Sequence, residues 1–487
     1  MKKTNPLVDI FRFKRKTPGK LSLATLLAAS LFAFSCADDA ELVSNADTYE
    51  DARTSAASKA GNIGINVLVN TEVNAVIDQL KPYGMIMDVI PQINALTMRI
   101  PSSNLTKIQA LSFVLAANPD ATRNGAPIDN VAVSDFSAGL STWNLDAVNV
   151  TEIGRGRTIA QDGSGVFIGV LDTGLLDSWR QYFPQERIAE EYAMSFGGGG
   201  GTNGATPNQP NKWEHDQNSH GTHVASIILG FQLGGAYLNG VAPKATVIPV
   251  KVLNQNGSGW SSTIARGIVY MADLKAGPLS GSPVVVNMSL GGTVLDAVEK
   301  AAIDYAVAKG VIIVASAGNR GDGGMSYPGA YAPVISVASA GWKDAWTSPA
   351  WWYATNFPDP TNPADLYISE FSSRAKAGQD LDVIAPGSDI VGPYQLNSGA
   401  ISYYYLSGTS MAAPHVSGIV ALMAQVQPSI NASQAETTLE SIAIPVAPGS
   451  RSVRQSNGTY ETVTWGADAV GSGFVTADAA VAAASGI

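Results

Sequence analysis

Residues 406–416 read Leu-Ser-Gly-Thr-Ser-Met-Ala-Ala-Pro-His-Val, and the apolar helical pattern that follows predicts that Ser410 stands in the first turn of a helix. A serine hydroxyl there lies near the positive end of the helix dipole, where free backbone N–H groups can hold an oxyanion. The alternative is that Ser410 only caps the helix and that Pro414 is a first-turn proline. The rest of the chain decides between a nucleophile and a cap.

Two other residues favour the nucleophile. Asp172 follows an apolar run in Leu-Asp-Thr-Gly, and His220 opens a helical pattern in Ser-His-Gly-Thr-His-Val-Ala. Either residue alone is weak evidence, because an aspartate at a strand end often caps a turn and a histidine at a helix start is often structural. Together with Ser410 they supply the acid, base and nucleophile of an acyl-transfer triad.

Apolar, β-rich runs alternate with helical stretches in the larger part of the chain. The runs are residues 166–171, 245–250, 283–286 and 310–314. Near-continuous apolar strands separated by helices predict an α/β fold with a mostly parallel sheet covered by helices on both faces. The active site of such a sheet lies beyond the carboxyl ends of its strands.

Two segments, 177–215 and 341–368, interrupt this rhythm and are interpreted as surface insertions. The second is rich in tryptophan. It is either a flap that contacts substrate or a loop held by its own aromatic core, and the aromatic core is the favoured interpretation.

The N-terminus has the pattern of a secretory signal, residues 1–35, in which seven basic residues precede the apolar run Leu21–Phe34. That run is short for a membrane span. Cys36 is the only cysteine, so no internal disulfide can form. It resembles the lipidated cysteine of bacterial lipoproteins, and Cys-Ala-Asp-Asp at 36–39 resembles the acidic tag of surface-exposed lipoproteins. The alternatives are an ordinary cleavage site at residues 33–35 and an unmodified Cys36. We therefore expect export to the cell surface or outer membrane, with a lipid anchor, or secretion after processing.

Charge argues against a nucleic-acid partner. The chain has 487 residues and a formal net charge of −10, and residues 1–36 contain seven Lys or Arg and one Asp, which leaves −16 on residues 37–487.

Four regions follow the signal. Residues 36–61 are acidic and without period, as in a flexible tether. Residues 62–120 show the order β-α-β-β-α-β, which predicts a small α+β unit of ferredoxin-like topology. Residues 121–140 form a polar, aperiodic linker, and residues 141–487 form the large domain.

The motifs as a set resemble those of subtilisin-family serine peptidases, from about residue 144 to the C-terminus. They are Asp-Thr-Gly at 172–174, His-Gly-Thr-His at 220–223 and Gly-Thr-Ser-Met-Ala-Ala-Pro at 408–414. The resemblance implies a serine endopeptidase that acts on proteins or peptides through Asp172, His220 and Ser410. By the same resemblance, Asn319 in Ala-Gly-Asn supplies a side-chain donor to the oxyanion hole.

The resemblance also implies two walls of a substrate groove that pair with extended peptide. One wall contains Ser289, Leu290 and Gly291, and the other contains Gly257, Ser258 and Gly259. Arg320 would lie at the rim of the main specificity pocket and Ser326 near its floor. A cation at the rim predicts a preference for an acidic residue just before the cut.

By resemblance, residues 62–120 are a propeptide that assists folding and occupies the active site, and self-cleavage is expected within 120–140. This cut would separate the enzyme from an anchor at Cys36 unless the propeptide stays bound. Two other functions are left open: a processing protease for one partner protein, and an inactive protease-like surface scaffold.

No cofactor is required by this chemistry, and no metal site is expected. Structural calcium occurs in many relatives, but residues 231–240 lack the paired asparagines of the best-known calcium loop. His215 stands without other ligands at zinc spacing, and His223 and His415 are interpreted as structural.

Overall fold

The computed structural model describes residues 61–132, 141–153, 156–197, 208–233, 235–358, 362–396 and 398–487. The expected signal, Cys36 and the tether lie outside these ranges. Within them, no helix combines the length and the apolar composition needed to cross a membrane.

An eight-stranded sheet forms the centre of the large domain. Its strand order is β10-β13-β9-β15-β16-β17-β18, with β19 also paired to β17. All pairs are parallel except that of β17 with β18. The strands are β9 (Phe167–Asp172), β10 (Met194–Ser195), β13 (Thr246–Lys251), β15 (Val284–Met288), β16 (Val311–Ser316), β17 (Ile335–Trp342), β18 (Leu366–Ile368) and β19 (Val383–Pro386). The prediction of a mostly parallel sheet is confirmed, and each of the four apolar runs contains a strand.

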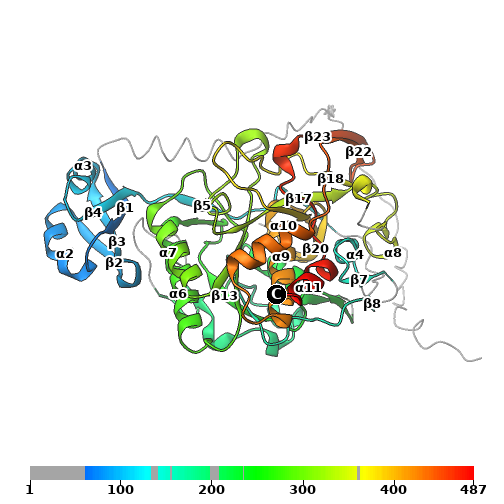
Figure 1. Ribbon diagram of the computed structural model, residues 1–487, viewed down its shortest axis with the longest axis horizontal. Coiled ribbons are helices and arrows are strands. Elements are labelled where there is room, and N and C mark those ends of the chain that lie inside the picture. Colours follow the sequence, from blue (N-terminus) through cyan, green and yellow to red (C-terminus); the bar gives the residue numbers. More distant parts are fainter. Residues whose placement is uncertain are drawn as a thin grey trace, which may run out of the picture. The chain divides into compact units, whose positions relative to one another are not determined.

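Helices cover both faces of this sheet (Figure 1). In β16, Ile312 and Val314 join the core beneath one set of helices, whereas Ile313 and Ala315 join the core beneath the other. This alternation is the two-residue period of a strand buried on both sides. The first set is α5 (His220–Leu229), α9 (Thr409–Val426), α10 (Ala432–Ile442) and α11 (Ala477–Ala484), and the second is α6 (Ser261–Ala276) and α7 (Ala297–Ala308).

Residues 62–119 form a separate antiparallel sheet with the order β2-β3-β1-β4. Its elements in chain order are β1 (Asn62–Val69), α2 (Val73–Leu80), β2 (Met85–Ile90), β3 (Ala95–Pro101), α3 (Leu105–Gln109) and β4 (Val114–Pro119). Val76 and Ile108 of the two helices pack with Val67 of the sheet in a core of their own. Ile90 and Ala95 instead join the core of α6 and α7. The small unit is thus docked on these two helices of the large domain.

Part of the segment that we predict as a linker is paired with the large domain. Strand β5 (Thr122–Asn124) pairs with β14 (Ser258–Trp260), and β6 (Asp129–Ala132) pairs with β21 (Ile401–Ser407). Strands of three or four residues are too short to show a hydrophobic period, so the sequence gives no sign of them. Residues 133–140 lie outside the described ranges.

The tryptophan-rich insertion is part of the main core. Trp342, Trp351 and Trp352 are at most 2 % exposed. The ring of Trp351 stacks on Tyr405 of β21 at 5.7 Å and approaches Trp143 at 6.3 Å. These rings therefore hold the insertion and β21, the strand that leads to Ser410, in one packed body.

The remaining elements are short and lie around this body. They are α4 (Trp143–Ala147), β7 (Thr151–Glu152), β8 (Gly156–Arg157), β11 (Gly230–Leu233), β12 (Ala236–Asn239), α8 (Trp351–Ala354), β20 (Ile390–Gln395), β22 (Gly449–Arg454) and β23 (Tyr460–Trp465). Strands β11 and β12, in the segment that aligns with the best-known calcium loop, pair in an antiparallel arrangement.

Candidate active site

Asp172 and His220 meet at the carboxyl edge of the sheet. Asp172 is the last residue of β9 and His220 the first of α5. Nδ1 of His220 lies 2.8 Å and 3.0 Å from the two carboxylate oxygens of Asp172. Both side chains are fully buried. A buried carboxylate against Nδ1 fixes the imidazole so that Nε2 is left for other chemistry.

Thr173 and Gly221 bring the two elements together. The hydroxyl of Thr173 accepts a hydrogen bond from the N–H of Gly221 at 2.9 Å and donates to Asp216 at 2.7 Å. A Cβ on Gly221 would lie 2.4 Å from the carbonyl oxygen of Gly174. Only glycine therefore lets the start of α5 approach the end of β9 this closely.

Ser410 is the second residue of α9 and is 3 % exposed. Its hydroxyl donates to the carbonyl oxygen of Ser289 at 3.3 Å, and Nε2 of His220 has no hydrogen-bond partner among the described residues. A Cβ on Gly125 would lie 2.8 Å from the same Ser289 oxygen and 3.5 Å from Cε1 of His220. His220 and Ser410 thus border one small space without a direct hydrogen bond, a looseness common in sites that hold no reacting substrate.

Asn319 and the backbone of Ser410 approach a common point. The N–H and the hydroxyl of Thr409 donate to Oδ1 of Asn319 at 2.9 Å and 2.8 Å. These two bonds orient the amide so that Nδ2 points away from Thr409. A Cβ on Gly408 would lie 3.4 Å from Nδ2 of Asn319 and 3.6 Å from N of Ser410. Two donors that converge beside a serine hydroxyl form the geometry of an oxyanion hole.

The segment that follows the small unit lies between the two expected walls of the groove. Asn124 and Gly291 exchange backbone hydrogen bonds, each of 3.0 Å, and the N–H of Gly125 donates to the oxygen of Gly257 at 2.8 Å. A Cβ on Gly257 would lie 2.4 Å from the oxygen of Gly125. Farther along, the N–H of Ile128 donates to the oxygen of Ser407 at 2.7 Å. The chain therefore runs through its own groove as an added strand.

Ser326 and Arg320, expected at the specificity pocket, differ in their surroundings. Ser326 is 6 % exposed, and a Cβ on Gly291 or Gly318 would lie within 3 Å of its side chain, so Ser326 lies between the two. Arg320 is exposed, and a Cβ on Gly323 would lie 3.1 Å from its Cβ.

The other histidines have no part in this arrangement. Burial lowers the pKa of His223 to about 3 and that of His415 to about 4, so both are neutral at pH 7. Nδ1 of the exposed His215 lies 3.2 Å from Asp177. Among the described residues, His215 belongs to no group of three ligands that could hold a metal.

Sequence reasoning missed a polar cluster that links the small unit to the large domain. Nδ2 of Asn66 lies within hydrogen-bond distance of oxygens of Asp120, Ser261 and Asp296, at 3.2, 3.1 and 2.8 Å, and shares its two hydrogens among them. Asp296 also caps α7 by accepting from the N–H groups of Val298 and Glu299. The spacing of Asp296 and Glu299 is a capping-box pattern and could have revealed the helix start, but not the contact with Asn66.

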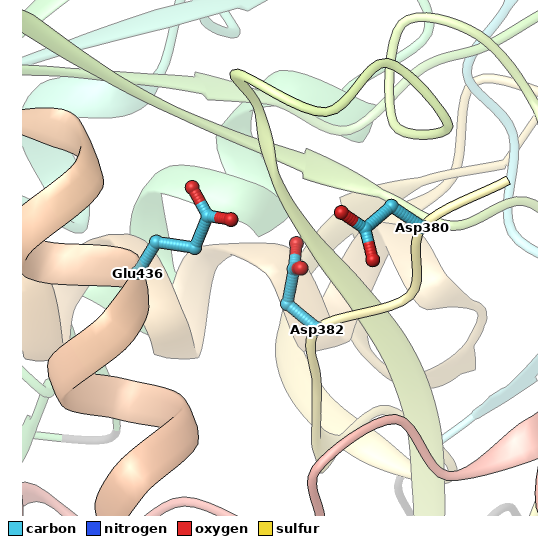
Figure 2. A group of neighbouring side chains, drawn as sticks. All are labelled: Asp380, Asp382 and Glu436. Atoms are coloured by element: carbon cyan, nitrogen blue, oxygen red, sulfur yellow. The ribbon is translucent and has the colours of Figure 1, made fainter.

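Three carboxylates gather beside α10 (Figure 2). One oxygen from each of Asp380, Asp382 and Glu436 lies within 4.8 Å of the others. Burial and neighbouring carboxylates raise the pKa of Asp382 and of Glu436 to about 7. Oδ1 of Asp382, which is 1 % exposed, has no partner among the described residues. Carboxylate oxygens with an open site suit a hard cation such as calcium, and these three residues would hold it.

A parallel sheet with a buried Asp–His pair, a serine at a helix start and two converging donors defines a serine hydrolase. The Subtilase family (Peptidase_S8) matches residues 163–466, and the chain belongs to this family. It is a serine endopeptidase that acts on proteins or peptides.

Relatives of known name agree with this assignment. The chain is 34 % identical over 264 residues to thermitase of Thermoactinomyces vulgaris, covering 54 % of this chain and 76 % of thermitase. It is 32 % identical over 285 residues to subtilisin DY of Bacillus licheniformis, covering 58 % of this chain and 84 % of subtilisin DY.

One solved structure extends the likeness in fold. Fervidolysin of Fervidobacterium pennivorans, a keratinolytic enzyme related to subtilisin, aligns with a TM-score of 0.60 and 23 % identity. The alignment covers 87 % of this chain and 61 % of fervidolysin.

Proposed function

We propose that this chain is the zymogen of an exported endopeptidase that uses Ser410 as nucleophile and is first held inactive by its own residues 62–128. The observation that carries the proposal is the run of backbone hydrogen bonds between residues 124–128 and the groove that contains His220 and Ser410. The buried Asp172–His220 pair supports the same roles.

In the proposed reaction His220 takes the hydroxyl proton of Ser410 as the oxygen attacks the peptide carbonyl. Asp172 holds the tautomer and stabilises the imidazolium, and Nδ2 of Asn319 and the N–H of Ser410 donate to the oxyanion. His220 then gives the proton to the leaving amine. Water, deprotonated by His220, releases the acyl group and restores Ser410.

Two backbone hydrogen bonds fix the position of the segment along the groove. Gly125 is hydrogen-bonded to Gly257 on one side of the site and Ile128 to Ser407 on the other. Three peptide bonds lie between Gly125 and Ile128, and we infer that the middle one, Ala126–Pro127, faces Ser410. The nitrogen of Pro127 belongs to a ring and carries no hydrogen, so this bond is a poor substrate and the segment is a slow, self-inhibiting one.

The N-terminal proposals rest on the sequence pattern. Residues 1–35 direct export, and Cys36 carries a lipid that anchors the zymogen to a membrane. Cleavage near residue 126 releases the catalytic domain unless the propeptide stays bound. In the mature enzyme Arg320 and Ser326 border the pocket for the residue before the cut.

Expression of the wild type beside Ser410→Ala tests the proposal. Wild type should label with a fluorophosphonate probe and shorten, and N-terminal sequencing should locate the new end. Ser410→Ala should stay full length and unlabelled. A wild type that neither labels nor shortens contradicts the proposal, and mass analysis of the N-terminal fragment tests the lipid at Cys36.

A further inference from the structure

The segment in the groove contributes one arginine that is wholly buried in the large domain. Arg123 and Glu299 are both 0 % exposed. Nε of Arg123 donates to Oε1 of Glu299 at 3.0 Å, and Nη2 donates to Oε2 of the same carboxylate. Nη2 also donates to the carbonyl oxygen of Val294 at 3.1 Å. This is the planar, two-point recognition that distinguishes arginine from lysine.

Glu299 belongs to the large domain and not to the segment. It lies in the first turn of α7, seven residues after Gly292 of the groove wall. A Cβ on Gly292 would lie 2.5 Å from the oxygen of Thr122 and 2.8 Å from Nη1 of Arg123. The absence of a side chain at 292 therefore leaves room for an arginine to pass over the wall toward Glu299.

The carboxylate of Glu299 depends on this arginine. Burial raises the pKa of Glu299, and the guanidinium of Arg123 opposes the rise. Among the described residues, only Arg123 forms an ion pair or a side-chain hydrogen bond with that carboxylate. When the segment leaves the groove, Glu299 loses this partner, and a carboxylate that can receive a two-point hydrogen bond is left at the subsite. The emptied subsite then favours a substrate that returns a guanidinium.

We propose that Glu299 makes the groove selective for proteins with arginine at the fourth position before the cleaved bond. Arg123 has that position relative to Ala126, the residue before the bond that faces Ser410. The proposal rests on the proposed endopeptidase function and on that register. In the unprocessed chain, Arg123 then occupies this subsite as the arginine of a substrate would.

The test compares three chromogenic peptides on the processed wild-type enzyme. Their sequence is X-Asn-Gly-Ala-4-nitroanilide, where X is arginine, its uncharged analogue citrulline, or norleucine. The arginine peptide should have a kcat/KM at least tenfold above the other two. This comparison needs no substitution, so a folding defect cannot affect it.

A variant then assigns the selectivity to Glu299. Glu299→Gln, which keeps size and loses charge, should bring the three peptides within about threefold of one another. Lys300→Gln, at the neighbouring position of α7, should keep the wild-type ratio. Fluorophosphonate titration gives the active fraction of each preparation.

The outcomes separate the two proposals. Equal kcat/KM for all three peptides in a wild type that labels fully overturns the selectivity and leaves the endopeptidase function standing. Selectivity that persists in labelled Glu299→Gln overturns the role of Glu299. A wild type that neither labels nor cuts any peptide refutes the proposed function, and the selectivity with it.

Discussion

Replacing Thr409 by valine should impair catalysis mainly by loosening the side chain of Asn319. Valine keeps the shape and the backbone N–H but removes the hydroxyl, which donates to Oδ1 of Asn319 at 2.8 Å and accepts from the N–H of Gly318 at 3.1 Å. Asn319 then keeps one of its two hydrogen bonds to Thr409.

The size of the effect follows from this geometry. Loss of an entire oxyanion-hole side chain raises the barrier by about 2.7–4 kcal/mol. Thr409→Val leaves the donor in place but removes one of two bonds that orient it, and a neutral hydrogen bond contributes about 1 kcal/mol net. We expect a barrier higher by about 1–2 kcal/mol, which is a fall in kcat of about 5- to 30-fold. KM should change little, because the donor acts mainly on the transition state.

The assay is a double-mutant cycle on titrated enzyme. Thr409→Val, Asn319→Ala and the double variant are compared with wild type by kcat on one peptide nitroanilide, with the exposed Thr437→Val as control. In the Asn319→Ala background, Thr409→Val should cause almost no further loss. An equal loss in both backgrounds would show instead that Thr409 acts by packing and not by orienting Asn319.

Three other outcomes are expected. Asn66→Ala in the full-length Ser410→Ala chain should lower the free energy of unfolding by about 1.5–3 kcal/mol in urea, because the buried carboxyl groups of Asp120 and Asp296 lose this donor. The exposed Asn70→Ala should lower it far less, and equal effects of the two variants would contradict this view. Pro127→Ala should speed self-processing, with the new N-terminus at residue 127 on sequencing; an unchanged rate, or an end elsewhere, means that another bond faces Ser410. Asp382 and Glu436 have native pKa values of about 7, above their unfolded values, so the native state binds more protons between about pH 4 and 7. In EDTA the loss of these protons should lower the Tm of the wild type as pH rises from 5 to 8, and added calcium at pH 8 should restore part of that Tm. Glu436→Gln should show a smaller fall in Tm with pH and a smaller calcium effect. If wild type and Glu436→Gln show the same fall and the same calcium effect, the three carboxylates do not explain them.

Much of the catalytic domain could be read from local sequence. The run around Val311–Val314 predicts a strand buried on both faces, and the structure contains β16 there with alternate residues in two cores. Asp172 at the end of one such run and His220 at the start of a helix were likewise visible. The distance between Asp172 and His220 could not be predicted from the sequence. It depends on the close approach of Gly221 to the carbonyl oxygen of Gly174.

Local sequence is enough to identify the class of enzyme, because each of the three motifs and each strand period involves a few neighbouring residues. The segment that occupies the groove became visible only from contacts between distant residues. The pairing of β5 with β14 joins residues more than a hundred positions apart, and the Arg123–Glu299 pair joins residues 176 positions apart. A three-residue polar strand has no period, and a buried ion pair has no local signature. Both features can be recognised only when the fold places their two partners side by side.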